Sequence, residues 1–229
     1  MSIGPDKSNA ERLFNIYTRS ADCRLIKVHF HPMDNSYRRL LIDQDDLKLF
    51  DTPMCYKPDK KGTVVPQTIW QPLQRGDVQR HVDDAELLPP VYFIGTDHVI
   101  GIKTSQVLDA NLRAPPGIYF PTAPAPLGGR ANTHFCLRWP GYTEFKKQVE
   151  LKNASGSPIT MWKLVERVAN FVARFIQEMA NQPIQEGQGP WRVGPGFIGI
   201  DNIYIVGLMQ VSRGVWQPIL QLDYFNTLP

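Results

Sequence analysis

The 229-residue chain has few cysteines, and their spacing fits no structural metal site. Cys23, Cys55 and Cys136 cannot all pair within one molecule, and none of them belongs to a Cys-x-x-Cys motif. Small disulfide-rich domains carry even sets of cysteines, and zinc ribbons need paired Cys-x-x-Cys motifs. We therefore exclude a disulfide scaffold and a zinc ribbon. A reducing, intracellular location in the cytoplasm or the nucleus is the simplest expectation.

Long apolar runs are also missing. A membrane-spanning helix needs about 18 or more consecutive apolar residues, and no such run occurs in the chain. Residues 1–10 contain neither a basic cluster nor an apolar stretch. We expect no membrane span and no secretory signal.

Several catalytic motifs are absent. The chain has no GxxxxGK[ST] and no GxSxG motif, which argues against a P-loop nucleotidase and an α/β-hydrolase. Residues 194–199 match GxGxxG only as a string, because no predicted strand precedes them and a strand follows where a helix should begin. The sequence therefore leans away from an enzyme and implies no cofactor.

The net charge is small and unevenly distributed. The chain has a formal charge of +3 and a pI of about 8.7. Residues 1–110 carry 14 Lys and Arg against 15 Asp and Glu, and residues 111–229 carry 11 against 7. A dedicated nucleic-acid-binding protein usually has a concentrated basic stripe, which this pattern lacks. Nucleic acid is therefore an alternative partner and not the first one.

The composition is that of a globular protein, with 42% hydrophobic and 21% charged residues. This length fits one large domain or two small ones, and we predict a single α+β domain over residues 1–229. Residues 112–130 form a candidate seam, because five prolines and three glycines interrupt regular structure there. Since Ile118 and Phe120 lie within it, we favour a packed loop over a free linker.

The strongest helical pattern covers residues 160–181. Apolar residues recur there at three-and-four spacing from Met161 to Met179, which predicts one long amphipathic helix. Ser157 or Thr160 can cap its N-terminus. A second, shorter helix is indicated near the start of the chain, where Ser8 and Glu11 form a capping-box pattern.

Strand patterns outnumber helical ones and do not alternate with them. Residues 24–31 alternate between apolar and polar side chains. Residues 134–139 and 145–151 predict a hairpin whose Trp-Pro-Gly-Tyr connection suits a type II turn. Residues 203–211 and 215–224 predict another, joined by residues 212–214. We expect a mainly antiparallel twisted sheet packed on one long amphipathic helix, with long Pro-rich loops.

Two histidines form a candidate metal site. His29 and His31 lie two residues apart on a predicted strand, so their imidazoles point to the same side. Zinc needs three or four ligands, and no other ligand stands at a diagnostic spacing. The alternative is a solvent-facing pair on an edge strand.

A second pattern suggests metal-dependent phosphodiester cleavage. Glu150 and Lys152 form an E-x-K motif on a predicted strand, in which a carboxylate could bind a metal ion and a lysine could assist the attacking water. Asp109 is the only upstream aspartate between Asp97 and Glu150. The alternative is an exposed charge pair on the outer face of the hairpin.

An aromatic and basic cluster surrounds the first predicted turn. Its candidate binding residues are Arg138, Trp139, Tyr142, Lys146 and Lys147. Aromatic rings supply contact area and stacking, and neighbouring cations attract phosphates or acidic side chains. The alternative is that Trp139 is a core residue beside a turn, with the lysines merely solvated.

The order of these features resembles a set of uncharacterised proteins from mushroom-forming fungi. The shared features are residues 139–142 followed by a basic strand, residues 158–160 opening the amphipathic helix, and Trp216 in a final strand pair. The resemblance covers about the last hundred residues. It implies an intracellular, lineage-restricted protein and brings no catalytic residues.

These patterns predict a non-catalytic binding or interaction module with a protein partner. One alternative is a metal-dependent nuclease or phosphodiesterase. The other is a nucleic-acid-binding domain that uses the basic C-terminal half.

Overall fold

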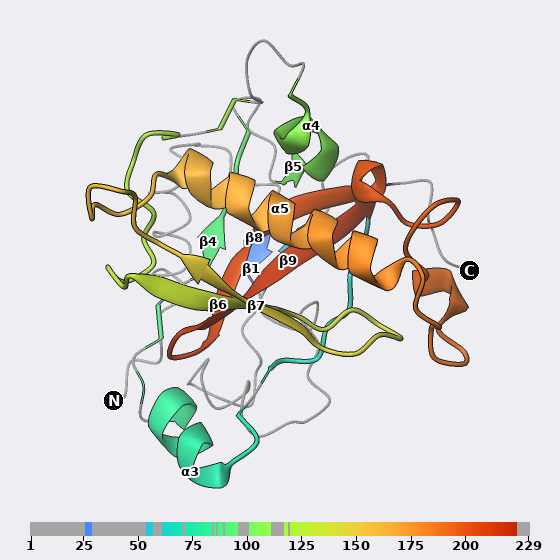
Figure 1. Cartoon of the computed structure of the whole chain (residues 1–229), viewed down its shortest axis with the longest axis horizontal. Coiled ribbons are helices and arrows are strands. Elements are labelled where there is room, and N and C mark those ends of the chain that lie inside the picture. The colour runs from blue at the N-terminus through green and yellow to red at the C-terminus, as the bar shows by residue number, and fades with distance from the viewer. Residues whose placement is uncertain are drawn as a thin grey trace.

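The structure is a computed structural model, and it confirms the α+β class. It describes residues 26–28, 54–56, 61–70, 72–83, 85, 87–88, 90–95, 101–110, 117–118 and 120–223. Its main sheet has seven strands (Figure 1), which are β3 (Lys61–Val64), β4 (Val91–Tyr92), β5 (Ile102–Lys103), β6 (Asn132–Leu137), β7 (Phe145–Glu150), β8 (Ile203–Ser212) and β9 (Val215–Asp223).

The two longest strands form the centre of this sheet. The strand order is β4-β8-β9-β6-β7, while β5 also pairs with β8 and β3 with β9. Every pair is antiparallel except β6 with β9, which makes the sheet mixed. A separate two-stranded sheet joins β1 (Ile26–Val28) to β2 (Met54–Tyr56). The predicted strand 24–31 is described over β1 alone, and the predicted helix near Ser8 lies outside the described residues.

The turn between β6 and β7 has the conformation that its sequence predicts. The Tyr142 backbone N–H donates to the Trp139 carbonyl at 3.2 Å. Gly141 has φ +80°, the value that the third residue of a type II turn requires and that glycine adopts without strain. Pro140 supplies the fixed φ of the second position.

The final hairpin differs from its prediction in the length of its turn. Ser212 pairs with Val215, so the turn holds only Arg213 and Gly214 instead of three residues. Gly214 has φ +98°, consistent with the left-handed conformation predicted at this glycine. Ser212 stays in β8, where its hydroxyl donates to the His81 carbonyl at 3.3 Å.

The longest described helix, α5 (Met161–Met179), lies across one face of the sheet (Figure 1). Thr160 caps it, because the Thr160 hydroxyl accepts the Lys163 backbone N–H at 3.2 Å. Its apolar stripe is buried as its spacing predicts, from Met161 to Ile176. Burial of each large apolar side chain contributes about 1.5–3 kcal/mol, so this helix is a main support of the core.

Aromatic rings fix α5 to the hairpin of β6 and β7. Phe171 packs on Phe135 and Phe145 with ring centroids 5.7 and 5.2 Å apart. One turn further along α5, Phe175 packs on Trp139 at 5.6 Å and on Tyr142 at 5.9 Å. The helix therefore holds both the hairpin and its turn in place.

The described part of the Pro-rich segment packs against the start of α5. The first N–H groups of a helix have no partner within the helix. Here the Met161 N–H donates to the Ala123 carbonyl at 2.8 Å, and the Trp162 N–H donates to the Pro121 carbonyl at 3.0 Å. Ile118 and Leu127 are buried in the core. These contacts make the described residues of this segment a packed loop.

The buried side-chain amides of Gln67 and Gln217 make hydrogen bonds beside β9 where the backbone ladder of this strand is interrupted. Pro218 has no N–H, so the ladder on this strand is interrupted. The Gln67 amide donates to the Pro218 carbonyl at 2.8 Å, and the Gln217 side chain accepts the Trp70 N–H at 2.5 Å and donates to the Thr68 carbonyl at 3.2 Å. These bonds hold residues 67–70 against β9, and the Arg138 backbone N–H, which donates to the Gln67 side chain at 3.2 Å, joins them to the end of β6.

The remaining helices are short. They are α3 (Arg75–Val78), which runs into a π-helical turn at Gln79–Asp83, α4 (Thr104–Leu108), and 3-10 turns at Gly189–Trp191 and Ile200–Asn202. In Figure 1, α4 lies on one long side of α5 and β7 on the other.

Candidate ligand pocket

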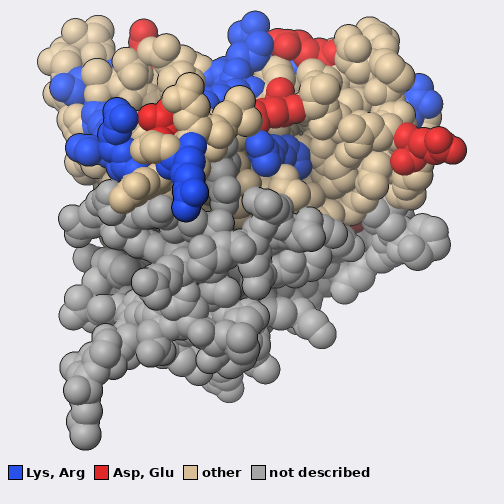
Figure 2. All heavy atoms as spheres, turned by 90° about the horizontal axis from the view of Figure 1, so that it is seen from below, with Lys and Arg blue, Asp and Glu red and all other residues tan. Residues whose placement is uncertain are grey.

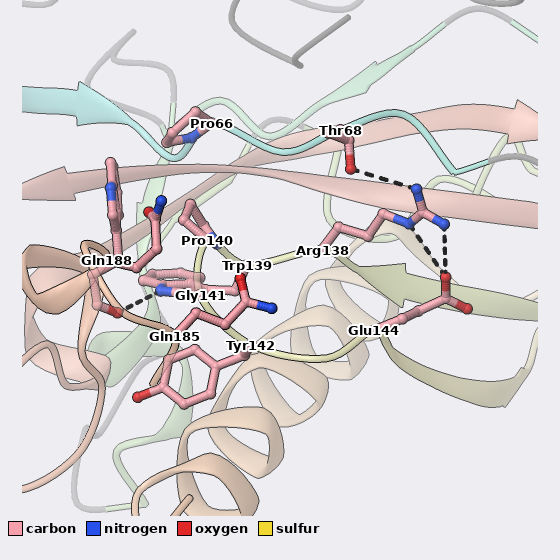
Figure 3. Close-up of a pocket in the computed structure, with 11 residues that line it drawn as sticks. Pro66, Thr68, Arg138, Trp139, Pro140, Gly141, Tyr142, Glu144, Gln185 and Gln188 are labelled. Atoms are coloured by element: carbon pink, nitrogen blue, oxygen red, sulfur yellow. Dashed lines mark hydrogen bonds and ion pairs between the residues drawn. The ribbon is translucent and has the colours of Figure 1, made fainter. Parts of the chain in front are cut away.

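A pocket of about 480 Å³ opens beside the Trp139–Tyr142 turn (Figure 3). Three segments that are distant in sequence form its walls. The lining residues are Pro66, Thr68, Arg138, Trp139, Pro140, Gly141, Tyr142, Glu144, Gln185, Gln188 and Trp191. We call this cavity the turn pocket.

Three hydrogen bonds join the turn to the segment of residues 185–193. The Trp139 indole N–H donates to the Trp191 carbonyl at 2.7 Å. The Gln185 backbone N–H donates to the Gly141 carbonyl at 3.0 Å, and the Val193 N–H donates to the Tyr142 hydroxyl at 3.2 Å. This irregular segment, which follows α5 in sequence, is therefore held as one wall of the pocket.

Gly141 allows the two walls to approach. A Cβ atom built at this position would lie 2.5 Å from a side-chain carbon of Ile184 and 2.6 Å from Cβ of Gln188. Only glycine combines the positive φ of the turn with such a close contact. The pocket geometry thus depends on this residue.

An ion pair forms the opposite end of the pocket. The Arg138 guanidinium donates to the Glu144 carboxylate at 3.1 and 3.2 Å, and more weakly to the Thr68 hydroxyl and the Ile69 carbonyl, both at 3.4 Å. Glu144 also accepts the Trp70 indole N–H at 3.0 Å. The pair joins residues 68–70 to the hairpin, so each charge is neutralised within the protein (Figure 3).

The structure divides the five predicted binding residues into two groups. Arg138, Trp139 and Tyr142 line the turn pocket. Trp139 is only 1% exposed, so it is mainly a core residue that supports the pocket, as the alternative interpretation expects. Tyr142 is half-buried and presents more of its ring.

Lys146 and Lys147 lie outside the pocket and both have partners. The Lys146 ammonium lies 3.9 Å from the centroid of the Trp70 ring. Lys147 pairs with Glu178 at 3.4 Å and lies over the Phe145 ring at 4.8 Å. These contacts reduce the positive charge that either lysine offers to an external anion.

Sequence reasoning missed the rest of the pocket. Gln185, Gln188 and Trp191 belong to a stretch that the sequence marks only as irregular, and Pro66 and Thr68 precede the hairpin by about 70 residues. No local periodicity in the sequence indicates that these segments contact one another. The one usable signal was the WPGY turn, since a buried tryptophan beside a forced turn needs neighbours to cover it.

The histidine site cannot be placed. His29 and His31 lie outside the described residues. Within the parts of the chain that are described, no group of three or more His, Cys, Asp or Glu residues lies close enough to hold a metal ion.

The candidate nuclease residues lie on different elements. Asp109 follows α4, and Glu150 ends β7, on the other long side of α5 (Figure 1). Glu150 and Lys152 are exposed, and the Glu150 carbonyl accepts a hydrogen bond from the Arg167 guanidinium. The fold therefore gives no indication that the three side chains share a site.

Cys136 on β6 is a buried thiol with little nucleophilic character. It is fully buried on the sheet face opposite α5, among Val206, Met209 and Ile219. Burial, followed by the negative charge of Glu144, raises the pKa of Cys136 to about 12. On the same strand, burial and the charge of Lys146 lower the pKa of His134, although a hydrogen bond with the Gly214 backbone opposes this. A cysteine nucleophile activated by His134 is thus disfavoured.

We predict that this thiol makes the protein less stable in alkali. Its pKa is about 12 in the fold against an ordinary value of 9.0. Above pH 9 the unfolded state loses this proton while the folded state keeps it, so the free energy of unfolding falls as the pH rises toward 12. The slope is at most about 1.4 kcal/mol per pH unit. Urea unfolding from pH 8 to 10.5 should show a steeper decline for the unchanged protein than for Cys136→Ala, and equal slopes would contradict the assignment.

Charge is distributed unevenly over the described surface. Figure 2 shows Lys and Arg gathered toward the end where α3 and the turn between β8 and β9 lie in Figure 1. Elsewhere on this face, positive and negative side chains stand next to each other. No helix among the described residues has the length and hydropathy to cross a membrane.

Comparison of the chain with protein-family models, curated proteins and solved structures gives no match. The functional argument therefore depends on the turn pocket itself.

Proposed function

We propose that this chain is a non-catalytic binding module whose turn pocket takes part of a protein partner. The observation that carries the proposal is the pocket's composition. It combines half-buried aromatic rings, two glutamine amides and an internally neutralised ion pair on a rigid support. A lining of apolar and aromatic surface with a few polar groups is typical of ligand-binding pockets.

The same pocket is poorly suited to acid–base catalysis. Glu144 is the only carboxylate among its lining residues. Both of its oxygens already accept hydrogen bonds, from Trp70 and from Arg138. A general acid or base must exchange a proton with its substrate, and hydrolysis by paired carboxylates needs a second acid.

Capture of partners tests this proposal. The tagged protein should retain a stoichiometric protein partner from a native lysate treated with nuclease. Trp191→Ala removes a half-buried ring from the wall of the pocket and should reduce the captured partner at least tenfold. A partner retained equally by this variant would contradict the pocket as its site, and turnover abolished by changing Glu150 or Lys152 would contradict the non-catalytic assignment.

Phe197→Ala is the matched control for this experiment. Phe197 is an aromatic residue that is 50% exposed and does not line the pocket. Its ring covers the Arg192 guanidinium at 4.3 Å. Removal of the Phe197 ring should leave the amount of captured partner unchanged. Thermal unfolding of Trp191→Ala and Phe197→Ala shows whether either variant loses its fold.

A second candidate function is sequence-independent nucleic-acid binding at the turn between β8 and β9. Arg213 in this turn is exposed, and the guanidinium of the exposed Arg130 lies against Gly214, 3.1 Å from where a Cβ would stand. Two cations close together can neutralise neighbouring phosphates. Binding to this surface should weaken by about one log unit in affinity per log unit of salt for each phosphate neutralised. Loss of captured proteins after nuclease treatment would favour this function over the first.

A further inference from the structure

We propose that the ligand of the turn pocket is an uncharged, proline-rich peptide segment in the polyproline II conformation. This inference rests on the proposed function and specifies its ligand. It follows from three properties of the pocket, namely its ring geometry, its free hydrogen-bonding groups and its lack of net charge.

The first property is the rigid arrangement of aromatic rings. The Trp139 and Trp191 rings stand at 83° to each other with centroids 6.2 Å apart, and Trp139 is supported from below by Phe175. Tyr142 also packs against Phe175, at 88°. Figure 3 shows the Trp139 ring between Pro140 and the Tyr142 ring, with Gln185 and Gln188 nearby. Buried Trp139 and Phe175 therefore hold the half-buried rings of Trp191 and Tyr142 in fixed orientations. Rigid aromatic surface favours a rigid apolar ligand such as a run of pyrrolidine rings, because little conformational entropy is lost on binding.

The second property is a set of hydrogen-bonding side chains, several of which can donate to a ligand. Within the described residues, the amides of Gln185 and Gln188 and the Trp191 indole N–H make no hydrogen bond to the protein. The Tyr142 hydroxyl accepts the Val193 N–H, which leaves its own proton to donate. A polyproline II segment has solvated carbonyls and, at proline, no N–H. It therefore offers the acceptors that these donors need, next to apolar rings.

The third property is neutrality. Arg138 and Glu144 neutralise each other, and no other charged residue lines the pocket. A ligand carboxylate, phosphate or ammonium would find no free counter-charge and would lose hydration on entry. An acidic or phosphorylated peptide is therefore disfavoured, and an uncharged proline-rich segment fits.

The probe for this inference is capped decaproline, with a capped Gly-Ser decapeptide as its control. Titration against the full chain, followed by tryptophan fluorescence and by calorimetry, should show saturable binding of decaproline alone. Gln188→Glu changes one amide to a carboxylate of the same size beside the ligand carbonyls, and it should weaken binding at least tenfold. Trp191→Ala should do the same, while Phe197→Ala should bind like the unchanged protein.

The outcomes separate this inference from the proposed function. Equal binding of the two peptides, or no binding of decaproline, overturns the inference. Binding of an oligosaccharide that Gln188→Glu weakens also overturns it, since the ligand class is then different. If a captured protein partner is insensitive to both Trp191→Ala and Gln188→Glu, the proposed function fails as well.

Discussion

Trp139→Ala is expected to lower the free energy of unfolding by about 3–5 kcal/mol, the range for truncating a large buried aromatic side chain. The indole is 1% exposed and packs against Phe175 and Trp191. Its N–H also bonds the Trp191 carbonyl, so the substitution removes core packing and one link between the pocket walls together. Urea unfolding followed by far-UV circular dichroism measures the loss.

Trp162→Ala is the matched control for this substitution. Trp162 is a half-buried tryptophan on α5 that packs at the border of the core. Since less of its surface leaves water on folding, its truncation should cost less than about 2 kcal/mol. If both substitutions lower the free energy of unfolding equally, the result contradicts the deeper burial of Trp139 in the core.

Gly207→Ala is expected to cost about 3 kcal/mol and to loosen β4, because it overpacks the centre of the sheet. A Cβ at Gly207 would collide with the Val91 carbonyl and would lie 3.2 Å from the Tyr92 Cα. These are backbone atoms of β4, which pairs with β8 at Val91↔Leu208 and Tyr92↔Gly207. They can move only if that pairing is lost.

Hydrogen exchange distinguishes this local effect from general instability. The amide of Phe93, which donates to the Val206 carbonyl at 2.9 Å, should lose protection in Gly207→Ala, while amides in α5 keep theirs at low denaturant. Gly199→Ala is the control, because its Cβ would have 3.8 Å to the nearest atom, an ordinary contact. Equal stability of the two variants would contradict the close approach of β4 and β8.

Local patterns predicted the elements that depend on local chemistry. The helix of residues 160–181 is observed as α5, since its apolar spacing and the Thr160 cap act within a few turns of chain. The WPGY turn is observed because Pro140 and Gly141 restrict their own backbone angles. The final hairpin was predicted, but the predicted length of its turn was wrong by one residue. The Ser212 hydroxyl and the Arg213 N–H both donate to the carbonyl of His81, a residue far away in sequence, and Ser212 stays in β8.

The pocket and the parallel pairing of β6 with β9 could not be predicted in the same way. Both depend on contacts between segments far apart in sequence, such as the 71-residue separation between Gln67 and Arg138. Arg138, Trp139 and Tyr142 were found because they flank a recognisable turn. The glutamines that complete the pocket carry no pattern of their own and gain their place from the hydrogen bonds of residues 185–193.

The measurement that tests the central claim most directly is photo-crosslinking from inside the turn pocket. A photoreactive benzoylphenylalanine replaces Gln188, or in a control replaces Phe197, and the protein is irradiated in nuclease-treated native lysate. Our account predicts one dominant crosslinked protein from position 188, joined through a proline-rich segment, and little from position 197. Crosslinks of equal yield and identity from both positions, or none from position 188, would contradict the turn pocket as the binding site.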